Sequence, residues 1–434
     1  MTKHNVFLLS LGCSKNTVDS ERLMAQAEAS GIAFTEHADE ADTILVNSCG
    51  FIQDAKEESI AATLAAIDKK AEGAIQKVFV MGCLSELFRK EMKEEMPEVD
   101  GFFGTRELPE VLAAIGAAYQ EGLYDRRSLL TPPYFSYLKI AEGCNRGCSF
   151  CSIPKIRGRY QSQPIDQLLR EAALLQKTGV KELNVIAQDI SMYGYDTEGK
   201  SMLNDLVLRL SDMAFDWIRL LYAYPVNFPL EVVETMRERE NICNYLDVPL
   251  QHCNDRILRS MNRGINKQET IQLLETIRDK NPDIRLRTTM VVGYPGETRE
   301  EFEELLEFVE ETRFDRLGCF AYSHDEHAPS FTLEDTVTPE EKQNRVAELM
   351  ELQESVAEEN NRLLEGKTVK VLIEQIEDGS ALGRTEYDAP EVDNECILTI
   401  GDKGFGIGSF CMATISDSSA YELYGQIVGE IISA

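Results

Sequence analysis

Three cysteines stand within eight residues of this chain, in the stretch Cys144-Asn-Arg-Gly-Cys148-Ser-Phe-Cys151. They directly follow the apolar run 137–141, which has the composition of a β-strand. Three thiolates can bind three irons of a cubane iron–sulfur cluster, because such clusters are held by cysteine sulfur. The fourth iron then has no protein ligand. Since an open position on a metal is where an exogenous molecule binds and reacts, the stretch predicts a reactive cluster.

Two other uses of these cysteines are open on the residues alone. A tetrahedral zinc site needs a fourth ligand, and the nearest downstream histidine is the distant His252. A structural disulfide needs an oxidising compartment, and the odd total of 11 cysteines does not suit a disulfide framework. The run Val6–Leu11 is too short for a signal-peptide core, and no apolar run has membrane-spanning length. We therefore expect a cytoplasmic protein with reduced thiols.

The spacing Cys-x3-Cys-x2-Cys, with Phe150 before the last cysteine, resembles that of the radical S-adenosylmethionine (SAM) enzymes. The resemblance implies a [4Fe-4S] cluster on Cys144, Cys148 and Cys151, with Phe150 near the cofactor. It also implies that the amino and carboxylate groups of SAM chelate the open iron. Reductive cleavage of SAM would then give a 5′-deoxyadenosyl radical.

The first third of the chain contains three apolar runs that each end at a cysteine. These are Val6–Leu11 before Cys13, Thr43–Val46 before Cys49, and Val78–Met81 before Cys83. Helical patterns at Asp19–Ala29 and Asp54–Ala71 separate them, and in the second pattern Ile60, Leu64 and Ile67 recur at helical spacing. Alternation of strands and helices predicts a parallel sheet, whose strands share one carboxyl edge. The three cysteines are therefore expected to converge, although three separate buried core residues are the alternative.

This third resembles the N-terminal domain of the methylthiotransferases, a branch of the radical-SAM enzymes. The matching stretches are Leu11-Gly-Cys-Ser-Lys-Asn16, Val18-Asp-Ser-Glu21, Asn47-Ser-Cys-Gly50 and Met81-Gly-Cys83. The resemblance implies a second [4Fe-4S] cluster on Cys13, Cys49 and Cys83. The Lys-Asn form followed by Val-Asp-Ser-Glu resembles the branch that modifies a ribosomal protein, whereas the tRNA-modifying branch tends to read Gln-Met-Asn.

The central part of the chain alternates six β-type runs with helical patterns. The expected strands are 137–141, 182–187, 217–222, 245–249, 286–292 and 316–321. The expected helices are 164–177, 203–213, 229–239, 254–261, 267–279 and 298–312. Six βα units predict a partial TIM-like barrel with its ligands at the carboxyl ends of the strands. A helix at Pro109–Gln120 is expected to end the preceding domain, and the pair Pro132-Pro133 marks a linker.

Several polar or glycine-rich stretches follow these predicted strands. Within the resemblance, Gln188 and Asp189 contact the SAM amino group, and Gly293, Pro295, Gly296 and Glu297 lie along its adenine. His252 fits a hydrogen-bonded core histidine better than a catalytic one. Arg157 and Arg159 are candidates for binding substrate or a carboxylate, with a solvated surface as the alternative. The other five cysteines lack ligand spacing and are expected to pack in cores: Cys243, Cys253, Cys319, Cys396 and Cys411.

After a helix that starts at Thr338-Pro339 and ends near Glu365, the pattern changes to short β runs. These are Thr368–Glu374, Ala381–Thr385, Glu395–Leu398, Phe410–Ser416 and Glu422–Val428. Five short strands with glycine-rich turns predict a small closed β-barrel, and their position resembles the OB-like TRAM module. That module often binds RNA, but residues 366–434 carry four basic and twelve acidic residues. Such a charge repels phosphate and favours a basic protein partner, as does the net charge of −31 for the whole chain.

The expected fold is α/β in three parts with a linker. The boundaries are 1–120 for the N-terminal α/β domain, 121–135 for the linker, 136–366 for the radical-SAM core and 367–434 for the TRAM barrel. The resemblance implies methylthiolation of the β-carbon of an aspartate in the basic small-subunit ribosomal protein uS12, with electrons from flavodoxin or ferredoxin. The alternatives are a tRNA (isopentenyladenosine C2) methylthiotransferase and a non-catalytic electron carrier.

Overall fold

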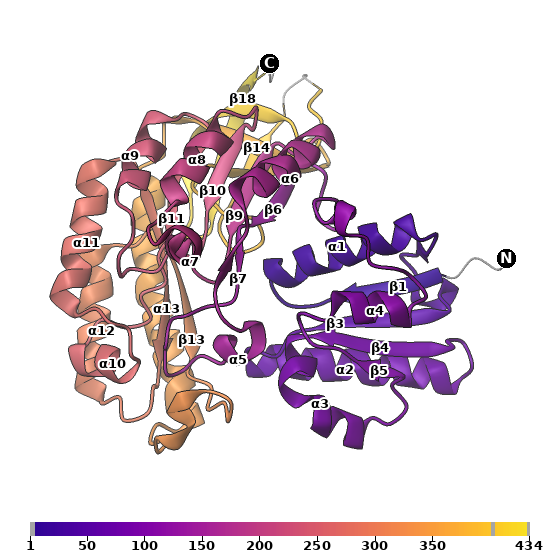
Figure 1. The fold of residues 1–434 in the computed structure, drawn as a ribbon. Coiled ribbons are helices and arrows are strands. Elements are labelled where there is room, and N and C mark those ends of the chain that lie inside the picture. Colours follow the sequence, from indigo (N-terminus) through magenta and orange to yellow (C-terminus); the bar gives the residue numbers. More distant parts are fainter. Residues whose placement is uncertain (1–4, 401–403, 432–434) are drawn as a thin grey trace.

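The computed structural model describes residues 5–400 and 404–431, which form three large sheets, one two-stranded sheet and the helices around them (Figure 1). The first sheet is parallel, in the order β2-β1-β3-β4-β5. Its strands are β1 (Asn5–Ser10), β2 (Ala33–Phe34), β3 (Thr43–Ser48), β4 (Lys77–Gly82) and β5 (Gly101–Phe102). Its helices are α1 (Ser14–Ala29), η1 (Ala38–Glu40), α2 (Gln53–Ala71), α3 (Cys83–Glu95) and α4 (Leu108–Ala114). The predicted parallel sheet is confirmed.

The second sheet has six parallel strands in the order β13-β12-β11-β10-β9-β6 and does not close. Its strands are β6 (Phe135–Lys139), β9 (Glu182–Ile186), β10 (Trp217–Leu220), β11 (Ile242–Asp247), β12 (Arg285–Val292) and β13 (Arg316–Ala321). The helices after them are α6 (Ile165–Lys177), α8 (Leu203–Ser211), α9 (Glu231–Glu238), α10 (Asp255–Ser260), α11 (Lys267–Lys280) and α12 (Arg299–Thr312). The predicted partial barrel is therefore confirmed.

Short elements lie at the carboxyl ends of these strands. They are β7 (Ala141–Glu142), α5 (Ile153–Arg157), β8 (Gln161–Ser162), η3 (Ile190–Met192), α7 (Tyr195–Glu198) and η4 (Pro329–Thr332), whereas η2 (Glu121–Leu123) lies in the segment before β6. In Figure 1, α5 lies between the second sheet and the N-terminal α/β unit. Within the described residues no helix is both long and apolar enough to cross a membrane.

The C-terminal strands form a closed barrel in the order β14-β15-β16-β18-β17, as predicted. They are β14 (Thr368–Glu377), β15 (Ser380–Thr385), β16 (Glu395–Thr399), β17 (Phe410–Ser418) and β18 (Glu422–Ile431). The barrel packs on the beginnings of the core strands, because Arg384 pairs with Glu182 at 2.6 Å and Asp388 pairs with Arg316 at 2.6 Å. Glu182 begins β9 and Arg316 begins β13. The barrel thus lies at the edge of the sheet opposite to the carboxyl ends.

The helix α13 (Pro339–Arg362) packs against β12 and β13 and buries Leu349, Val356 and Ala357. The Thr338 side chain caps its start by accepting from the Glu341 backbone N–H at 3.2 Å. The Glu341 carboxylate accepts from Arg345 at 2.8 Å. The helix ends three residues before the predicted end at Glu365.

One helix prediction in the N-terminal part was wrong at its end. The helix expected over Pro109–Gln120 ends at Ala114, because Gly116 takes a φ of +84° that ends the helical path. The helix predicted over Asp54–Ala71 is confirmed as α2, and its Ile60 and Leu64 are 40 % and 48 % exposed. The face that packs on the sheet instead carries small residues, described below, that hold the turn after β3. Also, α1 begins at Ser14, five residues earlier than the predicted start.

The segment 121–135, predicted as a linker, is anchored to both neighbours. The Arg127 side chain is 1 % exposed and pairs with Glu21 of α1 and, at 2.9 Å, with Glu171 of α6. Arg22 of α1 pairs with the same Glu171 at 2.8 Å. Removing one partner of such a buried ion pair lowers the stability of the folded protein by about 3–5 kcal/mol. The N-terminal sheet is therefore fixed against the core by charges that are almost fully buried.

Candidate functional site

Three turns at the carboxyl edge of the first sheet carry Cys13, Cys49 and Cys83, and these turns touch one another. Gly12 has a φ of +90°, and a Cβ there would lie 2.7 Å from the Cys49 Cβ. A Cβ on Gly50 would lie 2.7 Å from the Cα of Leu84, the residue after Cys83. Glycine is needed at Gly12 because a side chain would meet the neighbouring turn and because φ is positive. The parallel sheet thus brings together three cysteines that lie far apart in sequence.

Polar side chains from α1 and α2 hold these turns. The Asn16 amide of α1 donates to the Leu11 carbonyl at 2.9 Å and to the Ser48 carbonyl at 3.2 Å. The buried Ser59 hydroxyl of α2 accepts from the Cys49 backbone N–H at 2.9 Å and donates to the Cys49 carbonyl at 3.0 Å. Serine must face inward to do this, which explains why α2 turns Ile60 toward solvent.

The thiols of this first triplet differ in exposure: Cys13 is exposed, whereas Cys49 and Cys83 are buried. Burial raises the pKa of the Cys49 thiol. Burial also raises the pKa of the Cys83 thiol to about 12, and the Arg157 guanidinium, which lies 3.5 Å from the Cys83 Sγ, opposes that rise. Metal binding requires the thiolate, so a cluster entering here displaces protons from buried thiols.

The second triplet lies in the loop between β7 and α5. The Cys144 backbone N–H donates to the Gly158 carbonyl at 3.1 Å, and the Cys151 N–H donates to the Cys148 carbonyl at 3.2 Å. Two donors point at sulfur: the Arg146 backbone N–H lies 3.3 Å from the Cys144 Sγ, and the Arg263 guanidinium lies 3.3 Å from the Cys148 Sγ. Burial raises the pKa of Cys144 to about 11 and that of Cys151 to about 12.

Gln188 and Asp189, the residues predicted at the SAM amino group, lie beside this loop. The Asp189 carboxylate accepts from Arg146 Nε at 2.8 Å and from the Ser191 backbone N–H at 2.9 Å. The Gln188 amide donates to Glu142 at 3.3 Å. Its oxygen Oε1 is buried and has no hydrogen-bond partner among the described residues. A buried acceptor without a donor is what an incoming ammonium group would satisfy.

The glycine-rich turn after β12 lies against the same loop. Gly293 and Gly296 have φ values of +71° and +78°, and Pro295 between them is buried. The Tyr294 hydroxyl lies 2.8 Å from the Ser149 hydroxyl, and Phe150 packs in the cluster of buried side chains that contains Tyr294. The structure therefore brings both SAM-contacting stretches predicted outside the loop, 188–189 and 293–297, to the second cysteine loop.

Glu297 ends this turn and points into the protein. Its carboxylate accepts from Arg345 at 2.7 Å, and the His252 Nε2 lies 3.6 Å away. His252 is fully buried and its Nδ1 accepts from the Asn254 backbone N–H at 3.0 Å. These contacts agree with the interpretation of His252 as a core histidine. They also show that the Glu297 side chain ties the turn to α13.

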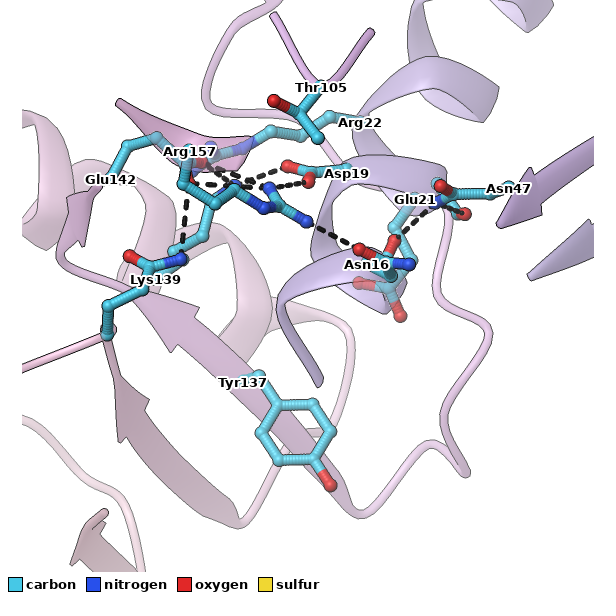
Figure 2. Close-up of polar contacts among 12 residues, drawn as sticks. Asn16, Asp19, Glu21, Arg22, Asn47, Thr105, Tyr137, Lys139, Glu142 and Arg157 are labelled. Carbon is cyan, nitrogen blue, oxygen red and sulfur yellow. Dashed lines mark hydrogen bonds and ion pairs between the residues drawn. The ribbon is translucent and has the colours of Figure 1, made fainter. Parts of the chain in front are cut away.

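An ion network of Arg157, Lys139, Asp19 and Glu142 lies between α1, β6 and α5 (Figure 2). Arg157, the last residue of α5, donates to Asp19 of α1 at 2.6 Å and to Glu142 at 3.3 Å. It also donates to Asn16, which holds the first triplet's turns. Lys139 pairs with Asp19 and, at 2.6 Å, with Glu142. Because α5 follows Cys151 directly, Arg157 links the second cysteine loop to Cys83 of the first triplet.

The network sets the charge of its carboxylates. Burial alone would raise the pKa of Asp19, but Lys139 and Arg157 outweigh burial and lower that pKa from 3.8 to about 2. The Glu142 pKa is lowered as well: burial opposes the shift, and Lys139 and Arg157 outweigh it. Of the two arginines named from sequence, Arg157 therefore binds carboxylates, whereas Arg159 is exposed. The sequence contained a signal for Asn16 and Asp19 in the matched stretches but none for Lys139, Glu142 or Arg263.

The side chains present fit two iron–sulfur clusters. All six cysteines are free thiols, the glycines leave space where the turns meet, and an arginine approaches one sulfur of each triplet. In residues 5–400 and 404–431 no three histidine, cysteine or acidic side chains are placed to share one metal ion. A cubane has no such requirement, because each thiolate binds a different iron. The five remaining cysteines lie in or against hydrophobic cores, as predicted.

Three family descriptions match successive parts of the chain. The radical SAM superfamily matches residues 138–309, and the TRAM domain matches residues 366–428. Residues 5–104 match a family described as the uncharacterised protein family UPF0004. The three matches fall on the N-terminal sheet, on the open core sheet up to α12, and on the C-terminal barrel, in chain order.

Solved structures share the fold at low sequence identity. The radical SAM methyltransferase TsrM from Kitasatospora setae, with tryptophan and a SAM analogue bound, superposes with a TM-score of 0.54 at 13 % identity. That match covers 73 % of each chain. The cobalamin-dependent SAM radical enzyme OxsB superposes with a TM-score of 0.51 at 10 % identity, over 76 % of this chain and 55 % of that one. At such identities the likeness concerns the fold.

Relatives of much higher identity span almost the whole chain. The ribosomal protein uS12 methylthiotransferase RimO of Pelodictyon phaeoclathratiforme is 78 % identical over 429 residues, which cover 99 % of this chain and 100 % of that protein. The proteins of the same name from Chlorobium phaeobacteroides and Chlorobium limicola are 73 % and 71 % identical over 98 % of this chain and 99 % of theirs. The chain therefore belongs to the RimO family of ribosomal protein uS12 methylthiotransferases.

Proposed function

We propose that this protein adds a methylthio group to the β-carbon of an aspartate in ribosomal protein uS12. The observation that carries the proposal is the pairing of two cysteine triplets through Arg157, in a chain 78 % identical to a uS12 methylthiotransferase. An unactivated β C–H bond is neither acidic nor electrophilic, so side-chain acid–base chemistry does not suffice and a cofactor must do the chemistry. The three relatives named above, 71–78 % identical, carry the uS12 name, which favours uS12 over the tRNA alternative.

Each triplet would hold one [4Fe-4S] cluster. Cys144, Cys148 and Cys151 would hold the cluster that binds SAM, and Cys13, Cys49 and Cys83 would hold the other. When bound, these groups would supply a radical that takes hydrogen from the substrate, together with the sulfur and the methyl group that replace it.

The surrounding side chains would position SAM and fix the charge at the sulfurs. The free Gln188 Oε1 would accept from the SAM ammonium, and the turn Gly293–Glu297 would lie along the adenine, where its glycines allow close backbone approach. The Arg146 and Arg263 guanidinium groups lie 4.0 Å and 4.2 Å from the centre of the Tyr224 ring. That stack positions the Arg263 guanidinium beside the Cys148 sulfur, and hydrogen bonds to sulfur influence the reduction potential of a cluster.

The experiment is modification of purified uS12 by the anaerobically reconstituted protein with SAM and a reductant, followed by intact-mass analysis. We expect a gain of one methylthio group located on an aspartate. The Cys148→Ala variant should lose SAM cleavage and modification together. The Cys49→Ala variant should still cleave SAM but leave uS12 unmodified. The matched control Cys319→Ala, outside both triplets, should retain both activities, and modified product from Cys49→Ala would contradict the role of the first triplet.

The electron donor and the compartment belong to the same proposal. Flavodoxin or ferredoxin would supply the electrons, and the enzyme would act in the cytoplasm, where uS12 is made. The strongly acidic composition, with a net charge of −31, supports a basic protein partner over RNA. Reduction of the protein by a purified flavodoxin, followed as SAM cleavage, tests the donor.

A further inference from the structure

A groove of about 680 Å³ lies between the N-terminal unit and the open sheet. One wall is formed by α2 and α3, and the other by the segment 323–331 that follows β13. Two contacts hold the walls together: Lys56 pairs with Asp325 at 3.3 Å, and the Phe88 and His327 rings lie 4.6 Å apart. The groove is therefore a built feature of the interface between the two units.

The walls of this groove are attached to both cysteine triplets. Leu84, which lines it, follows Cys83 directly, and α2 begins shortly after the turn that carries Cys49. On the other wall, the Ser330 backbone N–H donates to the Ser149 carbonyl at 2.7 Å, between Cys148 and Cys151. A chain segment lying in the groove would thus run beside the loops of both triplets.

Large apolar side chains in the groove face solvent. Ile60 is 40 % exposed, Leu64 is 48 % exposed and Phe331 is 44 % exposed, and all three line it. Apolar side chains that gather in one exposed place, rimmed by polar residues, mark interaction sites. Ile60 and Leu64 lie one helical turn apart on α2, so they form a continuous stripe along the groove.

The rim of the groove is acidic. Glu91 and Glu95 of α3 and Glu326 of the opposite wall are exposed and line it, and no ion pair engages any of them among the described residues. The one lysine in the lining, Lys56, is already paired with Asp325. Unpaired carboxylates around an apolar stripe complement a basic segment that carries an apolar side chain.

We infer that this groove binds a basic segment of the protein substrate, with an apolar side chain of that segment packed on Ile60, Leu64 and Phe331. The inference rests on the proposed function, since it takes uS12 as the occupant. It differs from the expectation that the acidic C-terminal barrel is the docking surface. Several carboxylates of that barrel, including Asp388 and Asp393, are instead buried in ion pairs with the core.

The test measures the Kd of labelled, purified uS12 for the full-length reconstituted protein at low ionic strength. The double variant Glu91→Lys/Glu95→Lys reverses two rim charges, and Glu94→Lys/Glu98→Lys makes the same charge change outside the groove. Each exposed pair is worth a fraction of a kcal/mol, and reversal replaces attraction by repulsion. We therefore expect about tenfold weaker binding for the groove variant and a change within about twofold for the control.

A second pair of variants tests the apolar stripe. Leu64→Ser should weaken uS12 binding. The control Leu174→Ser, in α6, changes a leucine that is 37 % exposed and should leave the binding unchanged. SAM cleavage without uS12 should be unchanged in all four variants, which shows that they are folded and loaded. If groove and control variants bind uS12 alike while the wild type modifies it, the groove inference is wrong and the proposed function stands. If the wild type neither binds nor modifies uS12, the proposed function is wrong and the inference falls with it.

Discussion

Replacing Arg157 by methionine should loosen the contact between the two cysteine-bearing units. The Arg157 side chain is 2 % exposed and donates to Asp19 and Glu142, which are 18 % and 17 % exposed. Removing one partner of a buried ion pair costs about 3–5 kcal/mol, because the other charge stays buried and unpaired. Here both carboxylates keep Lys139, so we expect a loss near the lower end, about 3 kcal/mol.

The assay is hydrogen exchange of backbone amides in α1 and α5, which reports the free energy of local opening at this contact. The matched control is Arg159→Met, two residues further along and exposed. A double-mutant cycle with Asp19→Asn should give a coupling energy of about 1–3 kcal/mol between Arg157 and Asp19. Equal protection in Arg157→Met and Arg159→Met, or strictly additive effects in the cycle, would refute the claim that this network joins the units.

Three further predictions follow from the site geometry. Gly12→Ala should lower the iron bound by the first triplet, because a Cβ there meets Cys49. The control Gly31→Ala, also at positive φ but with no atom near, should leave the iron content unchanged. An iron assay of both variants tests this prediction. The pKa of Asp19 is about 2 in the folded protein, against an ordinary value of 3.8. Its contribution to the free energy of unfolding, about 2 kcal/mol, is therefore present above about pH 4 and is lost as the pH falls toward 2. The stability difference between wild type and Asp19→Asn should therefore shrink over that range in thermal unfolding, and a difference independent of pH would contradict it. Arg263→Met removes a donor 3.3 Å from the Cys148 sulfur and should make the reduction potential of the SAM-binding cluster more negative. A redox titration that finds an unchanged potential would contradict this prediction.

The elements of the core sheet could be predicted well because periodicity and burial agree there. All six strands and the six helices after them lie where the alternation of patterns places them, within a few residues. The closed C-terminal barrel could be predicted equally well, since short strands and glycine-rich turns are local features of the sequence. The contact of the turns that carry Cys13, Cys49 and Cys83 also followed from topology alone, because parallel strands share a carboxyl edge.

The features that the sequence did not reveal depend on contacts between distant residues. The inner face of α2 could not be identified from the helical spacing of Ile60 and Leu64, because it holds Ser59 and Thr63, whose hydroxyls are satisfied by backbone groups. Arg157 looked like any basic residue after a cysteine loop, and its partner Asp19 lies 138 residues away. The net charge of the C-terminal barrel likewise does not reveal which of its carboxylates are paired with arginines of the core.

Iron content is the most direct test of the claim that the chain holds two separate cubanes on two cysteine triplets. Anaerobically reconstituted wild-type protein should bind about eight irons per chain, since each [4Fe-4S] cluster contributes four. Replacing Cys13, Cys49 and Cys83 together by alanine, or Cys144, Cys148 and Cys151 together, should leave about four irons in each case. A wild-type content of about four, or a triple variant that keeps about eight, would contradict the account.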